Sequence, residues 1–356
     1  MSRLTSSLAL VLAAMATPAV AADWSEDWAG ETDMRGGYFH EPKDWSGLGD
    51  EDDSIAIETG VRYWYSWGSQ DHNIGSDNFT TTDNAHTGEL HLRIDDYQSR
   101  SYVKAWAGYS AAINGSYDSP IGSGDIVDGQ IGYAGADFGW NVLGDGRGSG
   151  LGGLVGYAYW NDSPRTDRVS FSTATSGDDV TFNEDTGIIN FPGDSTDSNI
   201  DLHMLRLGVS GKADFSDGLF DISGEVAAVP YAAINGVIGN HGISSGGLTP
   251  AGNPNFVKTS ETNIAGWGYG GMAEVMVGVQ PIENLTFRIG GRAWYVQGTY
   301  DATYSAAQVT DPTDSDALED PDFDTAPTLA NQNYIVTANP FSMLRYGLLA
   351  ELTYKF

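Results

Sequence analysis

The chain has 356 residues and a formal net charge of −31, because 48 acidic side chains face only 17 basic ones. This acidity argues against a nucleic-acid partner, since binding nucleic acid needs a basic face. The sequence contains no cysteine, which excludes disulfides, thiolate metal sites and cysteine nucleophiles. Its 46 Gly, 18 Tyr, 13 Phe and 10 Trp favour strands over helices, and Tyr and Trp suit the interfacial belts of membrane proteins.

The first residues have the features of a secretory signal peptide. Arg3 precedes a short apolar run, Leu8–Met15, and Ala19-Val20-Ala21 matches a small-residue cleavage site. The run is too short to cross a bilayer, which takes about 20 apolar residues. We expect residues 1–21 to be removed on export, with cleavage after Ala22 as the alternative. Every later apolar run is also short, so membrane insertion would require a closed barrel of strands.

Acidic side chains dominate residues 22–53, where Arg35 and Lys43 are the basic residues. Two interpretations of this periplasmic segment are open. High charge and low hydrophobicity are typical of a disordered leader. Alternatively the segment is a plug or a periplasmic contact, anchored by Trp24, Trp28 and Trp45.

From Ile55 onward the side chains alternate in character with a period of two, which indicates a half-buried strand. One face of Ile55–Trp67 is apolar and ends in aromatic residues. The opposite face carries Glu58, Arg62 and Trp64 among small residues. An apolar outer face with an aromatic end and a polar inner face is typical of a strand in a transmembrane barrel.

Nine further segments repeat this alternation, which predicts an all-β fold: a single transmembrane antiparallel β-barrel of about ten strands over residues 54–356. An even number of strands places both chain ends on the periplasmic side. The apolar faces of the nine segments lie in Leu90–Ile94, Val103–Tyr109, Ala134–Trp140, Leu151–Tyr159, Leu205–Phe215, Phe220–Val226, Trp267–Val279, Leu285–Tyr295 and Leu344–Phe356.

The connections between these segments alternate in length, as short periplasmic turns and long extracellular loops do in outer-membrane barrels. A water-soluble barrel would instead need a polar exterior, which the aromatic-ended apolar faces do not supply. The expected short turns are 96–100, 144–150, 216–218 and 281–284, and the expected long loops are 68–86, 114–127, 161–199, 236–262 and 305–336.

The chain ends in alternating apolar residues, Leu352, Tyr354 and a final Phe356. This ending is similar to the C-terminal assembly signal of bacterial outer-membrane proteins. Together with the signal peptide, it predicts a multi-pass barrel in the outer membrane of a Gram-negative cell envelope. The expected partners are outer-membrane lipid, lipopolysaccharide and the barrel-assembly machinery.

Charged side chains recur on the predicted inner faces. In a barrel of this size side chains fill much of the interior, and buried charges need partners. Two interpretations are open: a salt-bridged polar core, or a narrow, selective conduit, with Trp64, Trp106, Trp160 and Trp294 also pointing inward. The predicted charge network comprises Glu58, Arg62, Arg93, Glu274, Arg288, Arg292 and Arg345, and further inward charges are Asp95, Lys104, Asp137, Arg206, Lys212, Glu225, Glu351 and Lys355.

The last long loop is acidic and carries no basic residue. Its spacing does not match an EF-hand loop, so the sequence indicates a solvated acidic loop and no resident cofactor. Ca²⁺ or Mg²⁺ bridging such loops to lipopolysaccharide phosphates is the alternative hypothesis, and unchanged barrel stability without both ions would argue against it. The acidic residues are Asp311, Asp314, Asp316, Glu319, Asp320, Asp322 and Asp324.

The layout over residues 55–356 resembles the omptin family of ten-stranded outer-membrane barrels, and Leu151–Tyr159 and Gly347–Phe356 look like omptin strands. Omptins are proteases that activate water between an Asp-Asp pair and a His-Asp pair on the outer loops. At the corresponding places this chain offers Asp118, followed by Ser119, and His241, preceded by Asn240. The catalytic residues are therefore not matched, and the sequence also lacks the G-x-S-x-G and H-E-x-x-H motifs.

Three functional hypotheses follow. The first is a non-enzymatic barrel, porin-like or structural, with a narrow polar lumen. The second is a surface-binding or adhesion barrel that acts through its acidic outer loops, and the third is a divergent omptin-like protease. An open lumen would favour a conduit, a blocked lumen would favour surface binding, and a base beside an orienting carboxylate in the outer cleft would favour a protease.

Overall fold

A computed structural model describes most of the chain from residue 54 to its end. The predicted signal peptide (1–21), the acidic segment (22–53), Asn240 and the acidic residues of the last loop lie outside the described residues. So do residues 145–147 of the expected turn at 144–150 and all of the expected turn at 216–218. The described ranges are 54–110, 112–120, 122–126, 128–144, 148–165, 169–172, 181–183, 188–190, 193–195, 198–215, 219–239, 241, 255–282, 284–309 and 329–356.

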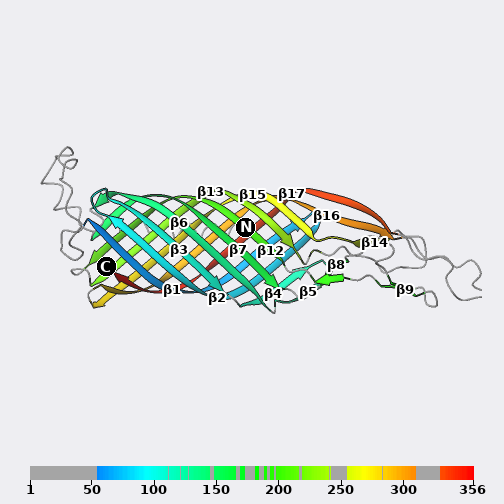
Figure 1. Ribbon diagram of the computed structural model, residues 1–356, viewed down its shortest axis with the longest axis horizontal. Helices are drawn as coiled ribbons and strands as arrows, with labels where there is room; N and C mark the ends of the chain where they lie inside the picture. The colour runs from blue at the N-terminus through cyan, green and yellow to red at the C-terminus, as the bar shows by residue number, and fades with distance from the viewer. Residues whose placement is uncertain are drawn as a thin grey trace, which may run out of the picture.

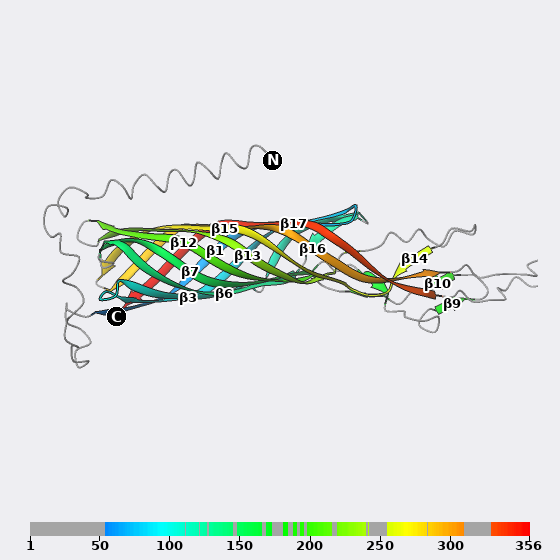
Figure 2. The same ribbon diagram turned by 90° about the horizontal axis from the view of Figure 1, so that it is seen from above.

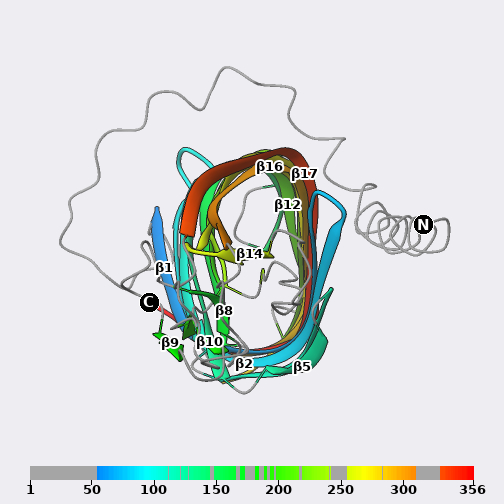
Figure 3. The same cartoon turned by 90° about the vertical axis from the view of Figure 1, so that its right-hand side faces the viewer.

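Ten long strands pair side by side into one closed antiparallel ring, and β1 closes it by pairing with both β2 and β17. The ring is visible along its axis in Figure 3, and the tilt of its strands in Figure 1. This architecture confirms the predicted barrel, and each predicted segment lies within one ring strand. The ring strands are β1 (Ile55–Ile74), β2 (Asp77–Asp96), β3 (Ser101–Ser110), β6 (Asp128–Gly144), β7 (Ser149–Arg165), β12 (Asn199–Phe215), β13 (Phe220–Ile238), β15 (Thr262–Ile282), β16 (Leu285–Val309) and β17 (Leu329–Lys355).

The remaining strands are short and lie at the end of the barrel opposite the C-terminus (Figure 1). At this end β16 and β17 extend beyond the other ring strands (Figure 2). No helix in the described part of the chain is long and apolar enough to cross a membrane. The short strands are β4 (Ile113–Ser119) on β2 and β5 (Gly122–Ile126) on β4, β14 (Asn255–Lys258) on β16, and the pairs β8 (Val169–Ser172) with β11 (Gly193–Ser195) and β9 (Thr181–Asn183) with β10 (Ile188–Asn190).

Two expected long loops are wrong, because 68–86 and most of 114–127 form strands. β1 and β2 continue to a two-residue turn at Gly75 and Ser76, and Ile74 pairs with Asp77 across it. Gly75 takes a positive φ of 61° there, as two-residue hairpin turns require. These strands were not recognised in the sequence because their outward residues are polar. They therefore lack the apolar face by which the other strands were predicted.

The outer surface of the barrel changes character along the strands. In the half that contains the C-terminus, here called the turn half, outward side chains are apolar and exposed, for example Val61 (55%), Leu90 (67%) and Leu348 (62%). Exposed Trp67 and Tyr346 pair across β1 and β17 at the far edge of this band. Beyond them, in the loop half, most outward residues are polar, and the exposed Ile335 is an exception. The turn half therefore has the surface expected against lipid, and the loop half has that expected in water.

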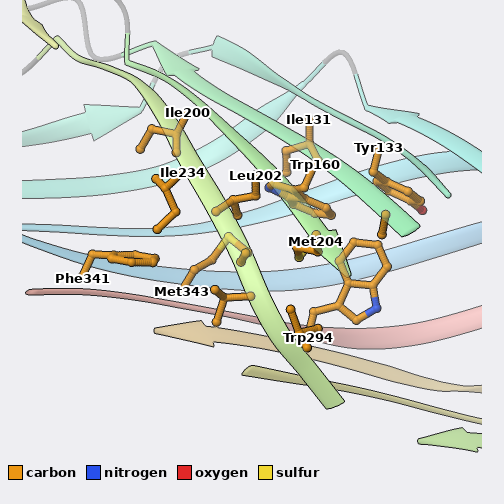
Figure 4. Packing of buried hydrophobic residues seen from close by; sticks show 14 of the residues in the cluster. Ile131, Tyr133, Trp160, Ile200, Leu202, Met204, Ile234, Trp294, Phe341 and Met343 are labelled. Carbon is orange, nitrogen blue, oxygen red and sulfur yellow. The ribbon is translucent and has the colours of Figure 1, made fainter. Parts of the chain in front are cut away.

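The interior changes in the opposite sense. Inward residues of the turn half include buried charges such as Arg206 and Arg288, whereas those of the loop half include Leu202, Ile234 and Phe341, which pack into one hydrophobic cluster. Figure 4 shows these apolar side chains converging from several strands. From the turn half to the loop half the outer face changes from apolar to polar, and the inner face changes from charged to largely apolar. Along each strand the same alternate residues continue to point inward. The charged interior is thus most extensive in the turn half, whereas the loop half has a largely apolar interior with a smaller buried polar group around Arg345.

Candidate functional site

The candidate site is the lumen of the turn half together with the layer that closes it. Arg62 on β1 and Arg292 on β16 share the same two carboxylates. Arg62 lies 3.1 Å from Glu89 on β2 and 3.4 Å from Glu274 on β15. Arg292 lies 2.6 Å from Glu89 and 2.7 Å from Glu274. Two cations and two anions from four strands therefore neutralise one another inside the barrel.

Arg62 also pairs with Glu351 on β17, which links this group to a second arginine. Arg288 lies 2.7 Å from Glu351, 2.9 Å from Glu58 and 3.0 Å from Asp221. Because its guanidinium offers several N–H donors in a fixed plane, one arginine can satisfy several carboxylates at once. The network consequently ties β1, β13, β16 and β17 together across the lumen.

A further cluster lines the opposite wall. Arg206 on β12 lies 2.6 Å from Asp137 on β6 and also pairs with Glu225 on β13. Lys104 on β3 lies 2.6 Å from the same Glu225. Removing one partner from such a buried pair leaves an uncompensated charge at a cost of several kcal/mol. These clusters therefore fix the relative positions of the strands that carry them.

A layer of four aromatic rings lies at the loop-half side of the charges. Trp64, Tyr133, Trp160 and Trp294 come from β1, β6, β7 and β16, and all are nearly or fully buried. Every pair among them is in ring contact, with centroids 5.0 to 6.3 Å apart. Because these strands lie around the ring and the four rings contact one another inside it, the aromatic layer reaches across the lumen. Figure 4 labels three of these residues, Tyr133, Trp160 and Trp294.

Cations face this layer from both sides. The Arg292 guanidinium lies 5.2 Å from the Trp64 ring centroid, and that of Arg345 lies 5.6 Å from the Trp160 centroid. Such cation–π contacts favour a fixed ring orientation. The Tyr133 hydroxyl donates a hydrogen bond of 2.7 Å to Glu89, which joins the aromatic layer to the charge network.

On the turn-half side of the network lies a cavity of about 90 Å³. It is lined by charged and small residues, among them Glu58, Arg93, Lys104, Lys212 and Lys355. This volume gives room for a few water molecules. The cavity is polar and reaches the ion-paired Arg62, Glu274 and Arg288, while none of the four rings lines it, so we call it the vestibule.

The structure brings together five of the seven predicted network residues and separates two. Glu58, Arg62, Glu274, Arg288 and Arg292 share the ion pairs described above. Arg93 pairs with Asp95 on its own strand at 2.8 Å. Arg345 lies beyond the rings and pairs with Asp83 at 2.6 Å.

Glu89, Asp83 and Asp162 were missed in the sequence. Glu89 lies two residues before His91, on the same face of β2, so extending the alternation would have found it. Asp83 and Asp162 fell within segments expected to be loops. The apolar residues of the C-terminal segment, Leu352, Tyr354 and Phe356, point outward and are exposed.

The two residues that the sequence offers in place of the omptin catalytic pairs lie in different environments. Asp118 is exposed on β4. His241 is buried, with its ring edge-on to Phe79 and Tyr304 and its Nδ1 atom 2.7 Å from the Thr262 hydroxyl. In the described ranges no three His, Asp or Glu side chains are placed to hold a metal ion.

No protein-family model matches this chain, and no curated protein matches it in sequence. Among solved structures, the outer membrane protease OmpT of Escherichia coli matches with a TM-score of 0.54, at 12% identity over 87% of this chain and 99% of that chain. The fold is that of an omptin-like outer-membrane β-barrel. At this identity the likeness concerns the fold alone, and it confirms the architectural resemblance inferred from the sequence.

Two other outer-membrane proteins align over most of the omptin-like barrel with lower scores. The translocator domain of the autotransporter NalP from Neisseria meningitidis gives a TM-score of 0.32, at 8% identity over 86% of this chain and 90% of that chain. A FadL homologue from Pseudomonas aeruginosa gives 0.24, at 12% identity over 85% of this chain and 90% of that chain.

Proposed function

We propose that this protein is a non-enzymatic, ion-impermeable barrel of the outer membrane, and that it acts as a structural support for its loop half at the cell surface. The observation that carries this proposal is the aromatic layer of Trp64, Tyr133, Trp160 and Trp294. These rings are in mutual contact across the lumen, and beyond them a hydrophobic cluster packs around the buried ion pairs of Arg345.

The membrane position follows from the two surfaces of the barrel. The apolar outer band of the turn half fits the hydrocarbon core, and Trp67 and Tyr346 at its edge fit the headgroup level. Outer-membrane lipid and lipopolysaccharide would surround this band, and the C-terminal segment would be read by the barrel-assembly machinery. Outward side chains of the loop half include Asp71, Asp118, Asp128, Asp201 and Asp301, so an acidic surface would face the medium.

A porin-like conduit is the second candidate, and the charged vestibule favours it. The ion pairs and the small volume of this vestibule are typical of the entrance to a narrow channel for polar solutes, not of a channel lined by apolar residues. Conduction would require ions to pass the four rings and the apolar core. Transfer of an ion into such a dry region costs many kcal/mol, so a large rearrangement would have to precede each passage.

We expect the purified mature protein to give no conductance steps in a planar bilayer, because the rings and the apolar core exclude water and ions. The measurement is single-channel recording at neutral pH, with an open porin inserted under the same conditions as the positive control. Circular dichroism of the same preparation verifies that the barrel is folded. Stable ohmic steps from the folded protein would overturn the closed-barrel proposal and establish the conduit.

We expect surface labelling to distinguish the two ends of the barrel. The chain has no native cysteine, and Ser76 and Ser99 are exposed serines in tight turns at opposite ends. A membrane-impermeant maleimide added to intact cells should modify Ser76→Cys, whereas Ser99→Cys should react only after the outer membrane is permeabilised. Equal labelling of both variants in intact cells, or the reverse order, would contradict the proposed orientation.

The absence of catalysis is part of the proposal. It is supported by the different environments of two residues: Asp118 faces solvent, whereas His241 is buried against aromatic rings. A general base needs access to water and substrate, and buried His241 lacks it. Cleavage of unstructured peptides by the purified barrel would contradict this part.

A further inference from the structure

Beyond the aromatic layer, one arginine lies between two buried carboxylates. Arg345 on β17 contacts Asp83 on β2 through two hydrogen bonds of 2.6 and 2.8 Å. The same guanidinium lies 3.7 Å from Asp162 on β7. All three residues are buried, with Arg345 and Asp162 each 1% exposed and Asp83 7% exposed.

The surroundings of this triad are closed to solvent. Trp160 packs on one side of it, and Ile131 and Ile200, which pair with Asp162 on the two neighbouring strands, are buried apolar residues. Gln70 on β1 donates a hydrogen bond of 2.6 Å to Asp162 and lies 3.3 Å from the His72 ring. The outward neighbours Asn161, Ser163 and Asp201 are polar, which places this layer beyond the apolar band.

The charges of the triad do not balance. Arg345 supplies one positive charge, while Asp83 and Asp162 together supply two negative charges if both are ionised. Burial lowers the pKa of His72 to about 4, so this neighbour is neutral at neutral pH. A buried charge without a partner costs several kcal/mol, and one negative charge here has none among the described side chains.

Unused hydrogen-bonding atoms lie in the same layer. Asp162 Oδ1, Thr81 Oγ1 and His72 Nδ1 are buried and have no hydrogen-bond partner in the described part of the chain. Thr81 pairs with Gln70 across β1 and β2, which places it beside the Gln70 bridge to Asp162. Buried polar atoms are seldom left unsatisfied, so these atoms offer unused hydrogen-bonding positions to a small polar species.

We propose that the Asp83–Arg345–Asp162 triad binds one additional positive charge, either as a proton on Asp162 or as a small monovalent cation beside it. A divalent ion fits poorly, because Asp83 is engaged by Arg345 and two carboxylates with one arginine leave a single excess charge. Bound charge would neutralise the layer and stabilise the junction of β1, β2, β7 and β17 beneath the loop half.

The titration of Asp162 gives the direction of the pH effect. Burial raises its pKa to about 7, Arg345 opposes the rise, and Asp83 adds to it. A carboxyl whose pKa is higher in the folded than in the unfolded chain binds its proton more tightly in the folded state. Its stabilising contribution is complete near pH 4 and is lost as the pH rises through about 7.

The test compares mature wild-type protein with Asp162→Asn in detergent micelles, in choline chloride, whose cation is too large for the site. From pH 5 to pH 8 the folding equilibrium constant of the wild type, divided by that of Asp162→Asn at the same pH and measured by urea titration, should fall on the order of 100-fold, about tenfold per pH unit up to the raised pKa. The division removes the opposite pH dependence of His72, whose pKa burial lowers in both proteins. The exposed Asp128→Asn is the matched control, and the same ratio taken with it should stay constant.

Further measurements identify the charge and keep the proposal testable if Asp162→Asn fails to fold. Infrared spectra of the wild type should show a protonated carboxyl band at pH 5 that disappears at pH 8, if the proton is the ligand. Recovery of stability at pH 8 on adding NaCl or KCl, absent in Asp162→Asn, would instead identify a small cation. A wild type that shows neither the band at pH 5 nor a gain of stability with NaCl or KCl at pH 8 would overturn the proposal.

Discussion

Replacing Arg292 with methionine should lower the free energy of unfolding by about 3–5 kcal/mol, the usual loss when one partner of a buried ion pair is removed. Arg292 is 5% exposed and holds Glu89 and Glu274 at 2.6 and 2.7 Å. Without it, two carboxylates keep Arg62 as their shared cation. Urea titration of the refolded barrel, followed by circular dichroism, measures the change.

The matched control is Arg165→Met. Arg165 pairs with Asp128 at 3.5 Å, but both side chains are about half exposed, and such surface pairs contribute about 1 kcal/mol or less. The double variant Arg292→Met with Glu89→Gln should recover part of the loss, because it also removes one of the stranded charges. Equal effects of Arg292→Met and Arg165→Met would show that the lumen charges are screened by water and do not hold the strands.

Replacing Trp160 with alanine should cost about 3–5 kcal/mol, the range for truncating a fully buried aromatic residue. Trp160 is fully buried and contacts Trp64, Tyr133 and Trp294. The truncation leaves a cavity in the middle of the layer and removes the surface over which Arg345 lies. The same urea titration measures it.

Trp267→Ala is the comparison for that variant, since Trp267 is 55% exposed on the outer face. Its side chain lies against lipid or detergent, which closes over the gap, so less than half of the Trp160→Ala effect is expected. A Trp160→Ala barrel as stable as Trp267→Ala would mean that the rings are loosely packed, and the lumen closure would then need another explanation.

Prediction from sequence succeeded where one face of a strand meets lipid. In the turn half apolar side chains alternate with charged ones, for example Val61 with Arg62 and Leu207 with Arg206. This pattern indicates a strand with one apolar and one polar face. It failed at Thr80–His86, where outward Thr82 and Asn84 alternate with inward Thr81 and Asp83. Both faces there carry small polar residues, so the sequence shows no alternation of apolar and polar side chains although the strand continues.

The sequence predicted that charged side chains would pair inside the barrel, but it did not predict which residues would pair. Alternation identifies Arg62 and Arg292 as inward, yet their partners lie on β2, β15 and β17, and two of these pairs, Arg62 with Glu351 and Arg292 with Glu89, are 289 and 203 residues apart in the chain. Which carboxylate meets which guanidinium depends on the stagger between neighbouring strands, and a shift of one residue would exchange the two faces. Arg345 was grouped with the same network, whereas the structure places four rings between it and Arg292.

The sequence by itself determined the fold class, the number of ring strands and which side chains of the turn half point inward, because a period-two pattern against lipid is a local property of each strand. Only the tertiary structure decided that four aromatic rings meet inside the lumen. Trp64, Tyr133, Trp160 and Trp294 lie at one height, and that height is set by strand tilt and stagger around the whole ring. It also showed that the two halves have opposite interiors, since burial on the inner face depends on what the nine other strands place across from it.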